Sequence, residues 1–164
     1  MHRRAFTLIE MLIVVLLMGI ISLAVLPNAT ADGTVRLVSA VNTVVADIEY
    51  AQSLALAEPS DAALVRFDQV AGAYWIAVAS DPTTPILRSN GDPYLITFGD
   101  NPGVDLRGIS VLLTDEKNDL AFDAFGRLTM IGERTIRLES VISGTMRVLI
   151  SAETGSAFIK SDGG

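Results

Sequence analysis

The chain lacks several residues on which common enzyme and metal sites depend. It contains no cysteine, and its single histidine is His2. The absence of cysteine excludes disulfide bonds, thiolate metal sites and cysteine nucleophiles. Histidine is the commonest general base and a common ligand of transition metals, so the sequence disfavours a Ser-His-Asp hydrolase and a zinc enzyme. We therefore predict no enzymatic activity, no catalytic residue, no cofactor and no metal ligand.

Basic residues are also few. The chain has 12 Lys and Arg against 19 Asp and Glu, which gives a net charge of −7. An acidic surface repels phosphate backbones, so we expect no nucleic-acid partner. At 164 residues the chain is long enough for one domain with a modest core.

One long apolar run lies near the N-terminus. Arg3 and Arg4 precede it, and from Phe6 to Leu26 the only charged residue is Glu10. A helix of this length is roughly 30 Å long, which is about the thickness of a bilayer core. We therefore expect a single membrane-spanning helix over residues 6–27, with the N-terminus in the cytoplasm because positive charge stays on that side.

Glu10 needs a partner that its own segment does not supply. An isolated carboxylate in hydrocarbon is costly and usually has a function. The run contains no Lys, Arg or His. A cut between Ala5 and Phe6 would create an α-amino group, which is a cation of the required kind, four residues before Glu10.

The stretch Arg-Arg-Ala-Phe-Thr-Leu-Ile-Glu, followed by an apolar helix, resembles the processing signal of type IV pilins and type II secretion pseudopilins. The resemblance implies that residues 1–5 are a leader, which a prepilin peptidase removes after Ala5, and that Phe6 is then methylated. It also implies that Glu10, the fifth mature residue, guides the subunit into a helical filament. The family strongly prefers glycine before the cut, where this chain has Ala5.

Two alternatives remain for this region. Glu10 could be a tolerated polar residue near the membrane interface. The whole run could instead be a secretory signal peptide, because Ala29-Thr30-Ala31 is an A-x-A cleavage site. Cleavage there would release a soluble β-domain protein that begins at Asp32. Against this alternative, the run is longer than a usual signal-peptide core.

A second helical pattern covers residues 35–57. Apolar residues recur there at spacings of three and four and predict one buried face, which Val38 and Val45 widen. The face consists of Leu37, Val41, Val44, Ile48, Ala51 and Ala55. Between the two helical patterns, Pro27 predicts a bend and Asp32-Gly33 a weak break. The helix either restarts with Asp32 or Thr34 as its N-cap or continues as a kinked rod.

After residue 60 the sequence consists of short apolar runs separated by turn residues, so residues 62–160 are predicted to form β-sheets. The candidate strands are Ala63–Phe67, Tyr74–Ala79, Tyr94–Phe98, Ile109–Leu113, Leu120–Phe122, Arg127–Met130, Thr135–Leu138, Met146–Ser151 and Ser156–Ile159. The predicted fold class is α+β, with a long N-terminal helix packed on an antiparallel β domain that occupies residues 28–164.

Three later stretches extend the resemblance. Residues 120–127 resemble the Phe-Asp-x-x-Gly-Arg turn of H-type minor pseudopilins and related minor type IV pilins, residues 148–155 their final strand and Thr-Gly turn, and residues 47–53 the end of their helix. The resemblance implies a minor pseudopilin that is stored in the inner membrane with its β domain in the periplasm. Its implied partners are other pseudopilins, the prepilin peptidase and the inner-membrane assembly platform. A minor type IV pilin is the alternative.

Other charged and aromatic groups are expected to be structural. The acidic runs at residues 115–119 and 100–105 lack the spacing of a calcium loop and are predicted to be solvated turns. Arg134, Arg137 and Arg147 are predicted to be ordinary strand surface charge, and Tyr74 and Trp75 to be core residues.

Overall fold

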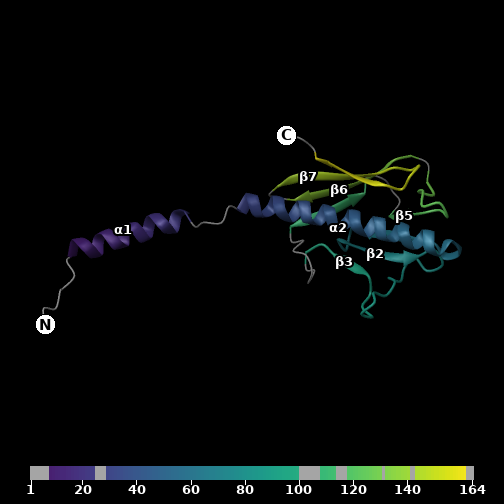
Figure 1. The fold of residues 1–164 in the computed structure, drawn as a ribbon, viewed down its shortest axis with the longest axis horizontal. Coiled ribbons are helices and arrows are strands. Elements are labelled where there is room, and N and C mark those ends of the chain that lie inside the picture. The colour runs from purple at the N-terminus through teal and green to yellow at the C-terminus, as the bar shows by residue number, and fades with distance from the viewer. Residues whose placement is uncertain are drawn as a thin grey trace.

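The computed structural model describes residues 8–24, 29–99, 108–113, 118–130, 132–140 and 143–161. Two helices are followed by β-strands, so the fold is α+β as predicted (Figure 1). Helix α1 spans Leu8–Ala24 and helix α2 spans Ala29–Ala57. Within the described ranges, no helix has both the length and the apolar character that crossing a membrane requires.

Helix α2 begins earlier than the predicted residue 35. Asp32 and Thr34 both lie inside the helix, so a restart with either of them as N-cap is wrong. A glycine inside a helix costs only about 1 kcal/mol relative to alanine. Burying one Leu or Ile side chain stabilises the fold by about 1.5–3 kcal/mol. The stabilisation from burying the apolar face of α2 therefore exceeds the cost of placing Gly33 inside the helix. Pro27, where we predicted a bend, lies outside the described residues.

The predicted apolar face of α2 is buried. Each of its six members is at most 2% exposed: Leu37, Val41, Val44, Ile48, Ala51 and Ala55. Val45 packs against the edge of the core, as predicted. Val38 is 40% exposed, so the buried face is narrower on that side than the sequence suggests. Asp47 of α2 is also buried, although it carries a carboxylate.

The first sheet is antiparallel, with strand order β3-β2-β1-β5. Its strands are β1 at Ala63–Asp68, β2 at Ala73–Val78, β3 at Leu95–Thr97 and β5 at Asp119–Ala121. The predicted strands Ala63–Phe67 and Tyr74–Ala79 are confirmed as β1 and β2, which pair as an antiparallel hairpin. Its turn is closed by the Asp68 carboxylate, which accepts the N–H groups of Val70 and Ala71, and by Gly72 at a φ of 60°.

The second sheet is also antiparallel, with strand order β4-β6-β7-β8. Its strands are β4 at Ile109–Leu113, β6 at Arg134–Ser140, β7 at Gly144–Ile150 and β8 at Ala157–Ser161. Each was predicted within a few residues of its observed ends. The turn at Glu153-Thr154-Gly155 joins β7 to β8 as expected.

The predicted strand at Arg127–Met130 is wrong. Leu128 makes an isolated bridge with Phe122, and Thr129 donates its N–H to the carbonyl of Ala121 beside the first sheet. Leu128 donates its own N–H to the carbonyl of Ala152, beside the second sheet. Because this segment divides its hydrogen bonds between the two sheets, it extends neither ladder.

The two sheets and α2 share one core. In Figure 1, β6 and β7 lie on one side of α2, and β2 and β3 lie on the other. Tyr74 and Ile76 of the first sheet are fully buried, as are Ile136 and Leu138 of the second, and all belong to the cluster around α2. Tyr74 is therefore a core residue as predicted, whereas Trp75 is half-buried and donates its indole N–H to the carbonyl of Pro82.

Candidate functional site

Helix α1 buries none of its described side chains, Leu8 to Met18, within this chain. Leu8 is 84% exposed, Ile9 65% and Met11 60%. Glu10 lies among them in the first turn, where a carboxylate is favoured by the helix dipole. A continuous exposed apolar surface marks a contact with a membrane or another protein. Ala5 and Phe6, the predicted processing residues, lie outside the described residues.

The three later stretches singled out from the sequence meet in space at Gln52 of α2. The side-chain amide Nε2 donates to the carbonyl oxygen of Gly126 at 2.6 Å and to that of Thr154 at 2.8 Å. Gly126 ends the Phe-Asp-x-x-Gly turn, and Thr154 lies in the turn between β7 and β8. The Gln52 clasp, as we call these two hydrogen bonds, thus ties the end of α2 to both turns.

The glycines of these two turns are required by the clasp. Gly126 and Gly155 have φ values of 74° and 68°, which favour glycine. A Cβ atom on Gly155 would overlap the carbonyl oxygen of Gly126 and would lie 2.5 Å from Nε2 of Gln52. The close packing of the two turns therefore leaves no space for a side chain at Gly155.

Asp123 organises the first of these turns. Its Oδ1 accepts the N–H groups of Phe125 and Arg127, both at 2.9 Å, and its Oδ2 pairs with the Arg127 guanidinium at 2.8 Å. Desolvation raises the pKa of Asp123, but the hydrogen bonds from Arg127 and Phe125 outweigh it and hold the pKa below its ordinary value. The ionised carboxylate is thus the form that holds the turn.

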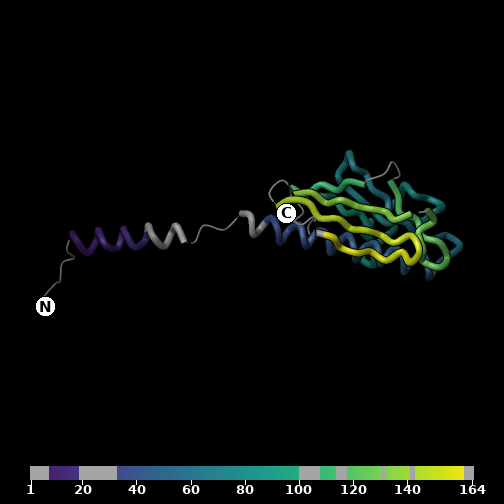
Figure 2. The backbone as a smooth tube through the Cα atoms, turned by 90° about the horizontal axis from the view of Figure 1, so that it is seen from above, coloured from purple at the N-terminus to yellow at the C-terminus, as the bar shows by residue number. Residues whose placement is uncertain are grey.

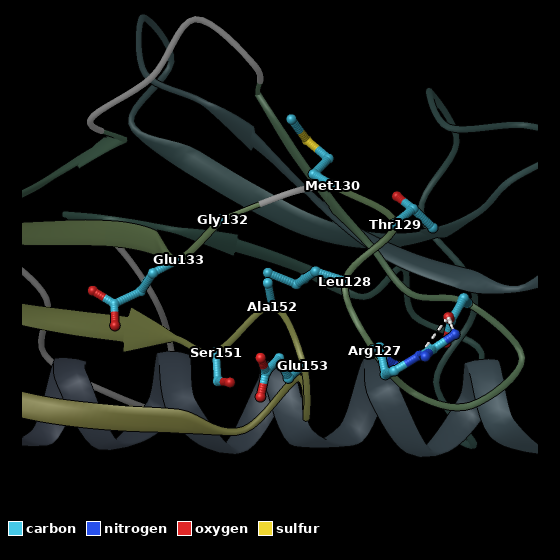
Figure 3. A pocket seen from close by; sticks show the side chains of 10 residues that line it. Arg127, Leu128, Thr129, Met130, Gly132, Glu133, Ser151, Ala152 and Glu153 are labelled. Atoms are coloured by element: carbon cyan, nitrogen blue, oxygen red, sulfur yellow. Dashed lines mark hydrogen bonds and ion pairs between the residues drawn. The ribbon is translucent and has the colours of Figure 1, made fainter.

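A groove of about 820 Å³ lies beside the clasp, between the segment after Arg127 and the end of β7 (Figure 3). Glu133 and Glu153 contribute carboxylates to its lining, and Leu128 and Ala152 contribute apolar surface. Because the chain has no cysteine and its one histidine is His2, the groove contains neither residue.

A buried carboxylate fixes α2 to the first sheet. Asp47 accepts the hydroxyl of Tyr74 at 2.5 Å and that of Tyr94 at 2.6 Å. Burial, reinforced by the nearby charge of Asp47, raises the pKa of Tyr74 well above its ordinary value. Burial and the hydrogen bond to Asp47 raise the pKa of Tyr94 as well. The Arg88 guanidinium lies 4.4 Å from the centre of the Tyr94 ring and places a positive charge beside this cluster.

The roles of Asp47 and Gln52 were not predicted from the sequence, although the helical spacing contains a signal for Asp47. Asp47 lies three residues after Val44 and four before Ala51, so it interrupts the apolar face and has to find a buried partner. Gln52 lies at the edge of that face, and its two acceptors are 74 and 102 residues away in the chain. No local pattern reveals such a contact.

Arg134, Arg137 and Arg147, all predicted to be surface charges, lie on two different faces of the second sheet. Arg134 is only 4% exposed, and its guanidinium contacts the sulfur of Met130, so its prediction as surface charge is wrong. The alternation of β6 places it on the same face as the buried Ile136 and Leu138. Arg137 and Arg147 lie opposite each other on the other face.

The two acidic runs considered as calcium sites lie mostly outside the described residues. Among the residues that are described, no group of three or more His, Cys, Asp or Glu side chains is placed to hold a metal ion.

Comparison with known proteins supports the resemblance seen in the sequence. Residues 1–26 match the prokaryotic N-terminal methylation motif. Among curated proteins, none matches the chain. The fold matches two crystal structures of the type IV minor pilin FimU of Pseudomonas aeruginosa. One has a TM-score of 0.53 and 21% identity and covers 76% of this chain and 88% of FimU. The other has a TM-score of 0.50 and 20% identity, with 75% and 91% covered. The chain therefore has the fold of a type IV pilin-like protein and carries the methylation motif at its N-terminus.

Proposed function

We propose that the chain is a structural filament subunit without enzymatic activity, and specifically a minor pseudopilin of a type II secretion system. The observation that carries the proposal is the apolar helix α1, whose described side chains are all exposed, with Glu10 in its first turn and a methylation motif over residues 1–26. A helix with such an apolar surface is unfavourable in a soluble domain that has no binding partner. It requires a surrounding of lipid or of similar helices.

The mechanism depends on one charge pair. Cleavage by the prepilin peptidase after Ala5 gives Phe6 a free, then methylated, amine. In the membrane or the filament interior, where the dielectric constant is low, this amine and the Glu10 carboxylate attract each other strongly, and either charge alone is costly. A neighbouring subunit therefore enters in the one register that pairs both charges.

The location of each part of the subunit follows from this membrane anchor. Residues 6–27 form the anchor in the inner membrane and later the filament core, with the N-terminus in the cytoplasm. The β domain lies in the periplasm. The partners are other pseudopilins and the inner-membrane assembly platform. The assembled pseudopilus helps to move folded proteins through an outer-membrane channel.

A minor type IV pilin is the second candidate, and the fold similarity to FimU favours it. The same anchor and the same processing serve both functions. A deletion strain separates them. Loss of exported folded proteins into the medium indicates the pseudopilus, whereas loss of surface pili, motility or DNA uptake with normal export indicates a type IV pilus.

The experiment that tests the filament function is the substitution Glu10→Ala. We expect the variant to remain in the membrane, because it is more apolar, while its recovery in sheared filament fractions falls at least tenfold. Glu49→Ala is the matched control, since Glu49 is an exposed carboxylate of α2. Equal recovery of Glu10→Ala and Glu49→Ala in filaments would refute the proposed role of Glu10.

A further inference from the structure

A small pocket lies between α2 and the connection from β2 to β3. Its volume is about 350 Å³, and it is lined by Tyr50 of α2 and by Arg88, Ser89 and Tyr94 of the connection. Tyr50 is 44% exposed and Ser89 is exposed, so the pocket opens to solvent. We call these four residues the Arg88 pocket.

The Arg88 pocket belongs to the side of the domain that faces away from the second sheet. In Figure 1, β2 and β3 lie below α2, and in Figure 2 the green to yellow strands of the second sheet lie on the viewer's side of α2. A short hairpin carries Arg88. Backbone hydrogen bonds from Arg88 to Asp92 and from Tyr94 to Ile86 join its two arms, and Gly91 closes its turn at a φ of 88°.

Aromatic rings fix the position of the Arg88 guanidinium. Its central carbon lies 4.4 Å from the centre of the Tyr94 ring, and the rings of Tyr94 and Tyr50 stack with their centres 5.6 Å apart. The Tyr94 hydroxyl is in turn held by Asp47 of α2 at 2.6 Å. A guanidinium that is already held in place loses little freedom when a ligand binds, so the pocket is preorganised.

Within the part of the chain that the structure describes, Arg88 forms no ion pair. Its Nε is buried and has no hydrogen-bond acceptor there. Two carboxylates of the same region are bonded elsewhere. Both oxygens of Asp47 accept tyrosine hydroxyls, and Asp92 accepts the side-chain amide of Asn90. A partly buried charged donor without an acceptor is costly, so an anion in the pocket would stabilise the guanidinium.

We propose that the Arg88 pocket binds the carboxylate of an Asp or Glu side chain on a neighbouring pilin-like subunit. The inference rests on the proposed filament function, which supplies the neighbour. A planar guanidinium can hold one carboxylate through two parallel hydrogen bonds. Tyr50 and Ser89 also line the pocket, and the hydroxyl of each is a further donor that an anion can use.

The composition of the pocket favours a protein over other anionic ligands. Tyrosine and arginine are among the residues that dominate the binding energy of protein interfaces. A single arginine in a chain of net charge −7 is a poor match for the continuous negative charge of a nucleic acid. The volume of the pocket is near the lower limit for sites that hold drug-sized molecules, which suits one side chain.

The substitution Arg88→Lys makes the pocket chemically testable, because it keeps the positive charge and introduces an amine. A carbodiimide joins an amine to a carboxylate only when the two are in direct contact. We would treat membranes of cells producing the full-length variant with a carbodiimide and identify the peptides linked at position 88 by mass spectrometry. The unaltered chain has only two lysines, Lys117 and Lys160, so the new links are readily assigned. We expect a link to an Asp or Glu of another pilin-like subunit.

Leu87→Lys is the matched control. Leu87 precedes Arg88 in the same hairpin, is 69% exposed and does not line the pocket. We expect its link to a pilin-like subunit to be at least fivefold weaker than that of Arg88→Lys.

Charge reversal separates contact with a neighbour from an effect on folding. We expect Arg88→Glu to lower the recovery of the chain in sheared filament fractions at least fivefold. Changing the linked carboxylate of the neighbour to lysine should then restore recovery. A variant that had only lost its fold would not be restored in this way, so a failure of the reversed neighbour to restore recovery would count against the contact.

The outcomes separate the Arg88 pocket from the filament function. If the unaltered chain enters filaments but Arg88→Lys links no more strongly than Leu87→Lys, the docking role is refuted and the filament function stands. A link only to Asp47 or Asp92 of the same chain also refutes the docking role, because the carboxylate is then internal. A link to a protein that is not pilin-like refutes the proposed occupant. Absence of the unaltered chain from filaments, with Met1 retained, refutes the filament function itself.

Discussion

The side-chain nitrogen Nε2 of Gln52 lies 2.6 Å from the carbonyl oxygen of Gly126, and this hydrogen bond joins residues that are 74 positions apart in the chain. The same nitrogen donates to Thr154 in a second turn. Three stretches that the sequence shows only as separate resemblances are thereby one structural unit. The turns at one end of the domain keep their places because the end of α2 holds them.

The first prediction concerns this clasp. Gln52→Ala removes both hydrogen bonds, each of which contributes about 0.5–1.5 kcal/mol, so we expect the free energy of unfolding to fall by about 1–3 kcal/mol. Urea unfolding of the full chain in detergent micelles, followed by the fluorescence of the single tryptophan Trp75, measures it. Asn42→Ala is the control, because Asn42 carries the same amide on the exposed side of α2. Equal stability of the two variants would contradict the role of the clasp.

The second prediction separates backbone strain from crowding. Gly144 and Gly155 both have positive φ, at 87° and 68°, but a Cβ on Gly144 meets open space. Gly144→Ala is expected to cost about 1–2 kcal/mol from the left-handed conformation alone. Gly155→Ala also has to move Gln52 and the Gly126 turn, so we expect a clearly larger loss in the same urea experiment. A loss no larger than that of Gly144→Ala would show that the two turns are not tightly packed.

The third prediction concerns the tyrosines that bond to Asp47. The pKa values of Tyr74 and Tyr94 are raised above the ordinary value of 10.0 by burial and by Asp47. A raised folded-state pKa gives a stability contribution that is complete below pH 10 and is lost as the pH rises through the folded-state value. We therefore expect the chain to stay folded up to about pH 10 and to lose stability above it, with tyrosinate absorbance near 295 nm rising together with unfolding.

Asp47→Asn tests the cause of that behaviour. Removing the charge relieves the repulsion between Asp47 and a tyrosinate, so Tyr74 and Tyr94 should ionise at a lower pH than in the unaltered chain. A spectrophotometric titration compares the two proteins. Identical titration curves would mean that the Asp47 carboxylate does not act on these hydroxyls.

The fourth prediction concerns the stability of the folded chain at acidic pH. The pKa of Asp123 is held below its ordinary value of 3.8, so its contribution to stability is present above that pH and is lost as the pH falls through the lower folded-state value. The stability difference between the unaltered chain and Asp123→Asn should therefore be larger at pH 7 than at pH 3. A difference that does not change with pH would contradict the role of the ionised carboxylate.

Much of the fold was predictable because local pattern and tertiary packing agree. The spacing of Leu37, Val41, Val44 and Ile48 predicts the buried face of α2, and the alternation in Ile109–Leu113 predicts β4 with its observed ends. The hairpin around Asp68 follows from turn residues between two apolar runs. In each case the residues that decide the structure are neighbours in the chain.

The errors arise where distant contacts decide the structure. Arg127–Met130 has the composition of a strand, but its hydrogen bonds go to two different sheets. Arg134 carries a charge but lies inside because the register of β6 places it beside Ile136 and Leu138. The Gln52 clasp could not be predicted from local sequence either, because both of its acceptors are distant from Gln52 in the chain. The predicted role of Glu10 depends on a neighbouring molecule and stays a prediction.

The measurement that tests the central claim most directly is the N-terminal residue and intact mass of the protein purified from membranes. The account predicts a chain that begins at Phe6, with one methyl group on its amine. A chain that retains Met1, or one that begins at Asp32, would leave Glu10 without the amine on which filament entry depends and would contradict the account.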